Sequence, residues 1–384
     1  MKVVGIICEY NPFHRGHHKQ IRWIKENFGN DAAVVCLMSG NYVQRGYPAI
    51  VDKTIRARAA VLAGADLVLE LPTPYVLSSA EGFAAGGVSI LGSFCDYLCF
   101  GSESGDAASL MHAAGILLSP EFPPLLRSKL NEGISFPAAR QAALEALGAD
   151  PELVLRPNNI LAVEYCKAIL AQHSAMEPLV IIREGSYHAK EADAENPSAT
   201  AVRAAMEAGL PWASFVPDSF LLEDAAIHTL QAGQRAILAK LRTMEETEFS
   251  ALPYGGEGLW RKLMHESRRQ ATLEDILTHV KSKRYTRSRL DRMVMCAFLG
   301  ISEEIRTKAV PYCRVLALNA LGRKVLKSAR ASTSIYNLGE NVDHPYQALE
   351  QRWEDLYGLF ARDIPEAPSQ GRKQRIFYHT EQSL

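Results

Sequence analysis

The amino-acid sequence predicts an α/β protein in which a Rossmann-like parallel-sheet domain is followed by a mainly helical C-terminal domain. The chain has 384 residues, a length typical of two domains. In the first 200 residues, short apolar runs alternate with stretches of helical spacing. This alternation is typical of a parallel sheet covered by helices on both faces. Beyond residue 215 helix-forming and charged residues dominate, which indicates a helical domain.

The individual elements follow from the same patterns. Apolar runs predict buried strands at residues 3–8, 33–38, 66–70, 96–100 and 179–182. Helical spacing predicts helices between them, at residues 17–28, 52–63, 79–91 and 159–171. We therefore expect residues 1–215 to form the Rossmann-like sheet domain, with an Ala/Leu-rich helical insert near 105–150. Residues 216–384 are expected to form the helical domain, with a polar, proline-containing tail at 364–384 that is partly disordered.

Composition and charge exclude several classes of protein. The formal net charge of -1 gives no global field toward nucleic acid or membrane, so any nucleic-acid site has to be a local patch. The seven cysteines are scattered, and the close pair Cys95 and Cys99 has no second pair or nearby His to complete a zinc set. No apolar run is long enough to span a bilayer, and the N-terminus shows no signal-peptide pattern. We expect a reduced cytoplasmic protein with no structural metal and no membrane contact.

The strongest chemical feature is the loop Glu9-Tyr10-Asn11-Pro12-Phe13-His14-Arg15-Gly16-His17-His18, which links the first predicted strand to a helix. The N–H groups and positive dipole end of a helix N-terminus suit phosphate, and Gly16 would let the backbone approach a ligand closely. His14 and His17 lie three residues apart, so both can face one ligand and donate to phosphate oxygens. The alternative is a plain turn with two surface histidines. The strand-loop-helix context favours phosphate binding.

Further motifs follow this loop in order, including Met38-Ser39-Gly40-Asn41, Gly64-Ala65-Asp66-Leu67, Phe100-Gly101-Ser102-Glu103, Pro157-Asn158-Asn159 and Lys283-Arg284-Tyr285-Thr286. His-X-Gly-His after the first strand resembles the signature of the nucleotidylyltransferase superfamily. Together, the motifs resemble the bacterial tRNA(Met) cytidine acetate ligases over most of the chain, fading beyond residue 330. The resemblance implies that His14 and His17 are catalytic and stabilise charge as the α-phosphate of ATP is attacked. The implied ATP contacts are Ile7, Cys8, Glu9, Tyr10, Asn11, Pro12, Phe13, His14, Arg15, Gly16, His17, His18, Lys19, Gln20, Gly101, Asn158, Arg183, Glu184, Ser198, Thr200 and Arg203.

The later ATP contacts each have a structural alternative. Gly101 could be a simple turn glycine, Asn158 an N-cap, and Arg183 with Glu184 a solvated charge pair. Ser198-Ala199-Thr200-Ala201-Val202-Arg203 resembles the Ser-Ser-Thr-X-Ile-Arg element with which the superfamily holds the triphosphate. Here Ala199 replaces the second Ser, so one hydroxyl contact is missing. The alternative is that these hydroxyls cap a helix and that the arginine lies on a surface face.

The segment between residues 281 and 292 carries six cations against Asp291. In a nearly neutral chain this concentration is a candidate RNA contact, with an aromatic ring available to stack on a base. A solvated basic helix end is the alternative, and the resemblance favours tRNA. The predicted tRNA contacts are Lys281, Lys283, Arg284, Tyr285 and Arg287.

The function implied by the resemblance is ATP-dependent acetylation of the wobble cytidine in elongator tRNA(Met). Acetate would attack ATP to give acetyl-adenylate and pyrophosphate, and the cytidine amine would then release AMP. ATP is thus a substrate, Mg²⁺ is expected with it, and no obligate protein partner is expected. Two alternatives stay open at this point. One is a nucleotidylyltransferase that makes a small-molecule cofactor, and the other is an RNA-binding protein that uses ATP only as a structural ligand.

Overall fold

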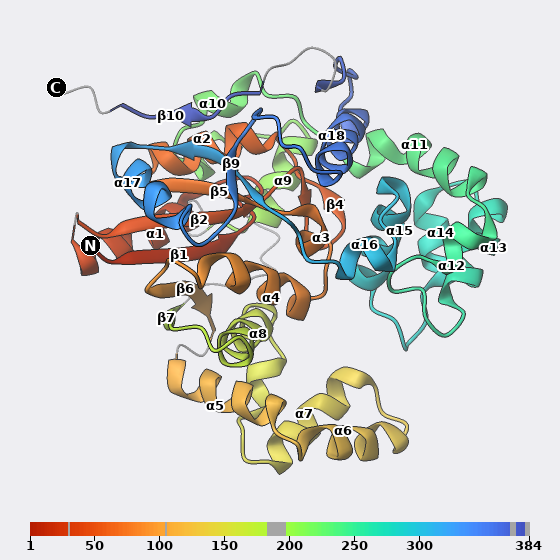
Figure 1. Ribbon diagram of the computed structural model, residues 1–384. Coiled ribbons are helices and arrows are strands. Elements are labelled where there is room, and N and C mark those ends of the chain that lie inside the picture. The colour runs from red at the N-terminus through yellow and green to blue at the C-terminus, as the bar shows by residue number, and fades with distance from the viewer. Residues whose placement is uncertain (30, 104–105, 183–196, 369–373, 381–384) are drawn as a thin grey trace.

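The computed structural model describes residues 1–29, 31–103, 106–182, 197–368 and 374–380. Its centre is an eight-stranded sheet in the order β10-β8-β5-β2-β1-β6-β7, with β9 beside β8 (Figure 1). The strands are β1 (Val3–Cys8), β2 (Ala33–Ser39), β5 (Leu67–Leu71), β6 (Tyr97–Ser102), β7 (Glu177–Ile182), β8 (Cys313–Leu318), β9 (Ile335–Asn337) and β10 (Phe377–Tyr378). From β5 to β7 all neighbours are parallel, which confirms the predicted strands and fold class. β8 differs, because it pairs antiparallel with β5.

Helices cover both faces of the sheet. α1 (Arg15–Phe28) and α2 (Lys53–Leu62) pack on one face, whereas α4 (Ala80–Leu91), α8 (Pro157–Ala171) and α17 (Ala320–Ala329) pack on the other. Alternate residues of β1 supply the two cores. Val4 and Ile6 belong to the first, and Val3 and Ile7 belong to the second, as the two-residue period of a strand requires.

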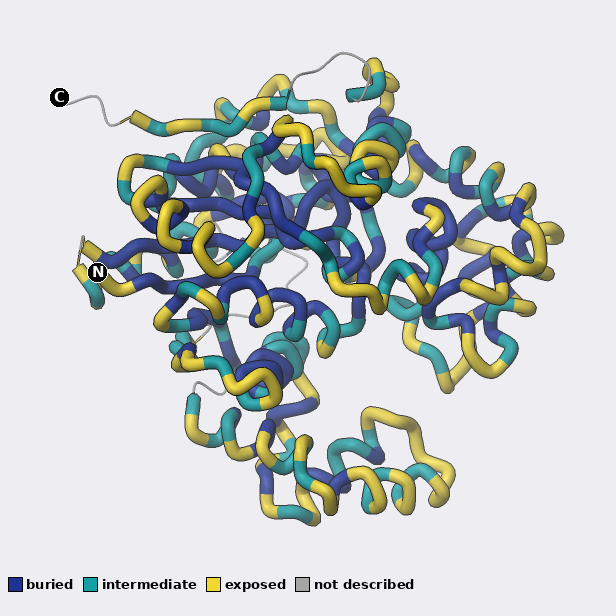
Figure 2. Tube along the Cα trace, viewed as in Figure 1, coloured by how far each residue is buried: buried dark blue, intermediate teal, exposed yellow. Residues whose placement is uncertain are grey.

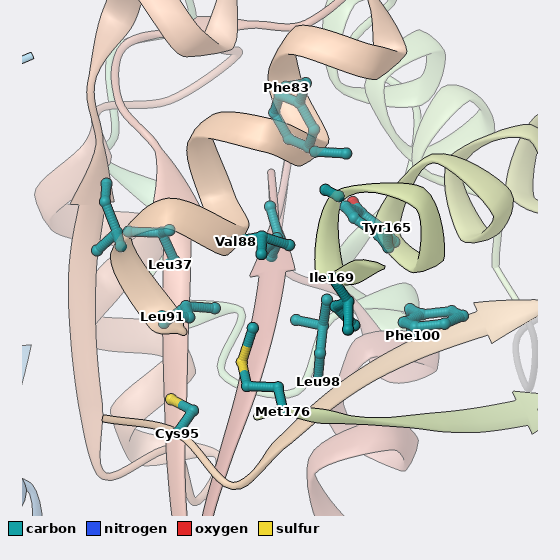
Figure 3. Packing of buried hydrophobic residues seen from close by; sticks show 14 of the residues in the cluster. Leu37, Phe83, Val88, Leu91, Cys95, Leu98, Phe100, Tyr165, Ile169 and Met176 are labelled. Atoms are coloured by element: carbon teal, nitrogen blue, oxygen red, sulfur yellow. The ribbon is translucent and has the colours of Figure 1, made fainter. Parts of the chain in front are cut away.

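The packing of α4 and α8 on β6 supports the site described below. Figure 3 shows this cluster, with labels on Leu37, Phe83, Val88, Leu91, Cys95, Leu98, Phe100, Tyr165, Ile169 and Met176. The rings of Phe100 and Tyr165 lie 5.3 Å apart and join the end of β6 to α8. Burial of each large apolar side chain stabilises the folded state by about 1.5–3 kcal/mol relative to leaving it exposed. The carboxyl end of β6 is therefore held firmly against the first turns of α8.

The strand order reverses beside β1. The chain continues from β1 to β2 and β5 on one side, and then crosses to β6 and β7 on the other. Open α/β sheets bind ligands outside the carboxyl ends of the strands at such a switch point. The loops that follow β1 and β6 therefore meet where a ligand site is expected.

The predicted helical insert is present. It consists of α5 (Ala107–Leu118), α6 (Phe122–Asn131) and α7 (Phe136–Ala146), and η1 (Pro151–Val154) then leads to α8. These helices extend from the sheet domain on the side of α8, and most of their residues are exposed or half-buried (Figures 1 and 2). Small residues such as Ala113 and Ala114 of α5 and Ala143 of α7 are buried where these helices pack.

A second core lies among the helices that follow. These are α11 (Leu230–Thr243), α12 (Glu246–Ser250), α13 (Leu259–Arg269), α14 (Leu273–Val280), α15 (Arg287–Leu299) and α16 (Glu303–Thr307). Ile237, Leu263, Ile276 and Met293 from four of them are fully buried together. The shorter elements α9 (Ala199–Glu207), η2 (Ala213–Phe215) and α10 (Phe220–Glu223) connect the sheet domain to this helical body. The helical region predicted beyond residue 215 is therefore present.

The last part of the chain returns to the sheet, which a division at residue 215 does not anticipate. β8, β9, β10 and α17 all belong to the sheet domain, so the helical body lies between two segments of that domain. α18 (Tyr346–Tyr357) packs on the helical core through Trp353, and η3 (Gly358–Phe360) follows it. Part of the tail at 364–384 is ordered, because Phe377 pairs with Ala317 of β8. A sheet edge offers unpaired backbone groups that stabilise a short strand whatever its polar flanks.

No helix in the described part of the chain is long and apolar enough to cross a membrane. The seven cysteines are free thiols, and burial raises the pKa of Cys99 to about 12. Among the described residues, no group of three or more His, Cys, Asp or Glu side chains is placed to hold a metal ion.

Candidate active site

A cavity of about 1070 Å³ opens at the carboxyl ends of β1 and β6. It is slightly larger than the roughly 300–1,000 Å³ typical of ligand pockets. Its lining has two parts, which we call the sheet wall (lining residues 6–207) and the helical wall (lining residues 228–292). The sheet wall brings together the predicted ATP contacts Ile7, Cys8, Glu9, Tyr10, Asn11, His14, His17, Gln20, Gly101, Asn158, Ser198, Thr200 and Arg203. The helical wall includes His228, Thr229, Leu230, Gln231, Gln234, Leu273, Glu274, Arg287, Ser288 and Arg292.

His14 and His17 are oriented by the start of α1 itself. His14 is the N-cap, and its Nδ1 accepts the N–H of Gly16 at 3.1 Å. The N–H of His14 donates to Nδ1 of His17 at 3.2 Å, and the two rings stack with centroids 3.6 Å apart. Because each Nδ1 accepts a hydrogen bond, the proton of each neutral ring is on Nε2. The backbone thus fixes one tautomer of each ring, with the proton on Nε2, and both histidines line the cavity.

The loop between β1 and α1 adopts an unusual conformation. Tyr10 has a φ of 48°, in the left-handed region that aromatic residues rarely occupy. Its ring packs on Phe13 and His17, with both centroids 4.8 Å away. A Cβ at Gly16 would lie 3.0 Å from Cε1 of His14, so the missing side chain makes room for the histidine ring. Strained backbone of this kind is concentrated at functional sites.

Arg56 of α2 ties this loop to the end of β2. Its guanidinium is buried and donates to the carbonyls of Glu9 at 2.6 Å, Ser39 at 3.1 Å and Val51 at 2.9 Å, and also to that of Gly40. Burial lowers the pKa of Arg56, and these carbonyls stabilise its charge together with the nearby carboxylates of Asp52, Glu9 and Glu70. The loops after β1 and β2 therefore form one rigid unit.

The segment before and within α9 reaches the same loop from much later in the sequence. Arg203 donates from Nη1 to the carbonyl of Asn11 at 2.7 Å, across 192 residues, and from Nη2 to Oγ1 of Thr200 at 3.3 Å. Ser198 caps the helix by accepting the N–H of Ala201 at 3.1 Å. The alternative of a surface arginine therefore does not hold for Arg203. The capping role of Ser198 holds, at a position that also lines the cavity.

The end of β6 is clamped to the start of α8. Asn158 donates from Nδ2 to Oε1 of Glu103 at 2.7 Å, and the N–H of Asn159 donates to Oε2 at 2.9 Å. Oδ1 of Asn159 in turn accepts the hydroxyl of Ser102 at 2.7 Å and the N–H of Glu103 at 2.8 Å. The N-cap of α8 is Arg156, so Asn158 does not have the capping role considered from the sequence.

A short hairpin of β3 (Tyr42–Val43) and β4 (Tyr47–Pro48) connects the two walls. The N–H of Gln44 donates to Oε1 of Glu9 at 2.6 Å, and its carbonyl accepts Nη1 of Arg292 at 3.3 Å. Gly46 has a φ of 87°, and a Cβ there would lie 2.6 Å from the backbone N of Arg292, so the hairpin packs directly on α15. Burial raises the pKa of the Glu9 carboxyl.

The remaining predicted ATP contacts have other surroundings. Phe13 is a core residue, and Arg15 donates from Nε to the carbonyl of Ser214 at 2.6 Å. Predicted contacts that are described but do not line the cavity are Pro12, Phe13, Arg15, Gly16, His18 and Lys19. Arg183 and Glu184 lie outside the described residues.

Comparison with known proteins identifies the family of the chain. The sequence model of the HIGH Nucleotidyl Transferase family matches residues 1–371. A tRNA(Met) cytidine acetate ligase of Clostridium novyi is 36% identical over 364 residues, covering 87% of this chain and 89% of that protein. One of Clostridium acetobutylicum is 35% identical over 374 residues, covering 91% and 92%. The chain belongs to the tRNA(Met) cytidine acetate ligase family.

Solved structures extend the likeness to the whole fold. Apo TmcAL of Thermotoga maritima superposes with a TM-score of 0.88 at 29% identity, covering 99% of this chain and 100% of that one. The same T. maritima protein bound with alpha-thio ATP superposes with a TM-score of 0.86 and the same coverage. The family resemblance predicted from the sequence motifs is therefore confirmed for this ligase.

The basic segment of the ligase begins between α14 and α15. Lys281 and Lys283 are exposed. Arg284 donates from Nη2 to Oε1 of Glu257 at 2.7 Å, and the hydroxyl of Tyr285 donates to the other oxygen of Glu257 at 2.9 Å. Part of the positive charge of this segment is thus balanced within the protein.

Arg287 lies on the helical wall, and its positive charge is neutralised more completely than that of Arg284. Its Nη1 and Nη2 donate to the two carboxylate oxygens of Glu274 at 2.7 and 2.6 Å, and its Nε donates to Asp291 at 2.8 Å. Asp291 also accepts the hydroxyl of Tyr47 at 2.8 Å. Arg287, which is one of the predicted tRNA contacts, therefore stabilises the contact between α15 and the hairpin.

Sequence reasoning missed several residues of the sheet wall, Glu103 among them, and all of the helical wall except Arg287, which is a predicted tRNA contact. Glu103 stands two residues after Gly101 in a motif that the sequence shows, so it could have been found. His228 and Gln234 belong to no motif, whereas Arg292 is the last of the six cations in the basic segment and is not among the predicted contacts. His228 is buried against Tyr357, with ring centroids 3.9 Å apart, and its position follows from tertiary packing alone.

Proposed function

We propose that this ligase acetylates the wobble cytidine of elongator tRNA(Met) with acetate and ATP, and that it releases AMP and pyrophosphate. The observation that carries the proposal is the pair His14 and His17, held as Nε2–H donors at the switch point of the sheet. The relatives are named for tRNA(Met), cytidine and acetate, and the T. maritima structure holds an ATP analogue. The substrate is a tRNA, so the reaction would take place in the cytoplasm.

In the first step, a carboxylate oxygen of acetate attacks the α-phosphorus of ATP. The bond from that phosphorus to the bridging oxygen breaks, and pyrophosphate leaves with the electron pair. His14, His17 and the N-terminus of α1 would donate to the phosphate oxygens, and Arg203 would hold the loop and add positive charge. Asn158 and the backbone at Gly101 line the side of the cavity where we place the nucleoside.

In the second step, the exocyclic amine of cytidine attacks the acetyl carbon of acetyl-adenylate. The bond from that carbon to the phosphate oxygen breaks, AMP leaves, and the nitrogen loses a proton. The wobble base has to leave its stack to reach the cavity, which an anticodon loop allows at small cost. The cavity is large enough for the base and acetyl-adenylate to lie together between the two walls.

We propose Mg²⁺ as an ion carried on the phosphates of ATP. Of the four carboxylates among the described lining residues, three have protein partners: Glu9 accepts from Gln44, Glu103 from the two asparagines of α8, and Glu274 from Arg287, and the fourth is Glu207 at the end of α9. These residues fit an ion bound mainly by phosphate oxygens and water, which is the usual arrangement of Mg²⁺ with nucleotides. When bound, Mg²⁺ would neutralise charge on the leaving pyrophosphate.

A pyrophosphate-release assay distinguishes this function from its two rivals. Release that requires acetate, together with N4-acetylcytidine in tRNA(Met), is the expected result. A nucleotidylyltransferase that makes a cofactor would release no pyrophosphate in response to acetate and tRNA. An RNA-binding protein that uses ATP as a structural ligand would bind both and turn over neither. Either of these results would overturn the proposal.

A further inference from the structure

Arg292 of α15 is a buried cation on the helical wall. It is 7% exposed, its Nη1 donates to the carbonyl of Gln44 at 3.3 Å, and the hydroxyl of Tyr254 is a second hydrogen-bonding neighbour. Its Nε is buried and has no hydrogen-bond partner among the described residues. The ring of Tyr254 lies 5.2 Å from the guanidinium carbon. The neighbouring carboxylate, Asp291, is bonded instead to other groups on the hairpin and α15.

Arg56 shows what a structural arginine looks like in this chain. Both guanidinium groups are buried, and burial lowers the pKa of both. Arg56 is surrounded by backbone carbonyls that accept from Nε, Nη1 and Nη2. Arg292 donates to one carbonyl and faces the cavity, which Arg56 does not. A buried charge with unused donors destabilises the fold unless a ligand satisfies it.

The position of Arg292 identifies the step that would need it. Gln44 bridges Glu9, directly after β1, and Arg292, so this guanidinium lies close to the end of the strand that leads to the histidine loop. ATP phosphates in that loop repel any second anion. An incoming carboxylate therefore requires a cation on its own side of the reaction centre. A planar guanidinium suits a carboxylate, and Val43 and Pro48 of the hairpin line the cavity with apolar surface for a methyl group.

We propose that Arg292 binds the carboxylate of acetate and holds it for attack on ATP. This inference rests on the proposed function. It assigns the helical body a part in the chemistry, besides any contact with tRNA, and it gives a reason for the direct packing of Gly46 on α15.

The test uses Arg292→Met and Arg292→Lys in the full chain, with Arg289→Lys as a matched control. Arg289 is one turn earlier on the same helix, donates to the carbonyl of Tyr254 and does not line the cavity. Methionine fills the space without the unpaired charge, so Arg292→Met should unfold at the same urea concentration as wild type or a higher one. KM values for acetate, ATP and tRNA are measured separately, and acetate binding is followed directly by saturation transfer to its methyl protons.

We expect the acetate KM to rise about 10- to 100-fold in Arg292→Met, the effect of losing a hydrogen bond to a charged group, while the other two KM values stay within about twofold. The acetate methyl signal should disappear in this variant and persist in Arg289→Lys. A rise in the tRNA KM alone would mean that Arg292 holds a tRNA phosphate, and it would overturn the proposal. Unchanged acetate binding, or lower stability with all three KM values raised, would also overturn it. If wild type bound acetate through Arg292 without turning it over, the proposed function would fail and the binding site would stand.

Discussion

The sheet wall of the cavity is positioned mainly by backbone groups, whereas the helical wall is positioned by side chains. His14 and His17 are fixed by N–H groups of their own helix start, and Arg203 reaches a backbone carbonyl. On the helical wall, Arg287 is held by two carboxylates and His228 by an aromatic ring. A site built on backbone geometry is encoded by a short local motif. A site built on side chains depends on the whole fold and on the contact between the two bodies.

Breaking the contact between the two bodies should have the largest effect on stability. Lys53 of α2 is buried and forms ion pairs with Glu70 of β5, at 2.8 Å, and with Glu354 of α18. Lys53→Met would leave two buried carboxylates unpaired, and the free energy of unfolding at pH 7 should fall by about 3–5 kcal/mol. For comparison, Lys129→Met removes an exposed ion pair between Lys129 of α6 and Glu132, the C-cap of that helix. In the same urea titration, the free energy of unfolding should fall by less than about 1 kcal/mol.

This destabilisation should depend on pH in a defined direction. Burial raises the pKa of both Glu70 and Glu354, and the loss of Lys53 removes the charge that opposes this rise. A carboxyl whose pKa is higher in the folded than in the unfolded state favours folding at pH values below its unfolded-state pKa. This contribution is lost as the pH rises through the folded-state pKa. The penalty of Lys53→Met should therefore shrink between pH 7 and pH 5. A penalty that grows over this range would contradict the burial of two unpaired carboxylates.

Loss of either histidine tests the sheet wall. His14→Ala and His17→Ala should each lower kcat by about 10²–10³-fold, because each removes a preorganised donor from a centre where charge develops. His14→Ala also removes the cap of α1, at a cost of about 1 kcal/mol, and His14→Asn should restore stability without restoring activity. His265→Ala, on the exposed face of α13, is the control. Near-normal turnover in folded His14 and His17 variants would remove this loop from the mechanism.

The two walls also differ in what the sequence could predict. The strands, the helices and the histidine loop have local signals: an apolar run, a helical period, or a Gly and two His at fixed spacing. The return of β8 into the sheet has no such signal, because its pairing with β5 joins residues that are far apart in the chain. Phe13 was predicted as a ligand contact from its place in the motif, but its side chain is in the core. A motif marks a segment, and the fold decides which of its side chains face the ligand.

Exposed lysines of the basic segment should have the smallest effect. Lys281 and Lys283 are exposed, whereas Arg284 and Arg287 are paired with carboxylates. If both lysines contact phosphate, Lys281→Gln with Lys283→Gln should flatten the log-log salt dependence of tRNA binding by about 0.7 per contact. A matched pair on α17, Lys324→Gln with Lys327→Gln, should leave the slope unchanged. Equal slopes for the two double variants would place the tRNA contact elsewhere and leave this segment a solvated helix end.

The central claim is that acetate attacks the α-phosphate of ATP within this cavity. Acetate labelled with ¹⁸O in both carboxylate oxygens tests it directly, because one labelled oxygen becomes the bridge of acetyl-adenylate and stays on phosphorus when the amine takes the acetyl group. After one turnover with tRNA(Met), mass spectrometry should find AMP that carries one ¹⁸O in its phosphate, and unlabelled pyrophosphate. Unlabelled AMP, or ADP with ¹⁸O in inorganic phosphate, would contradict the account.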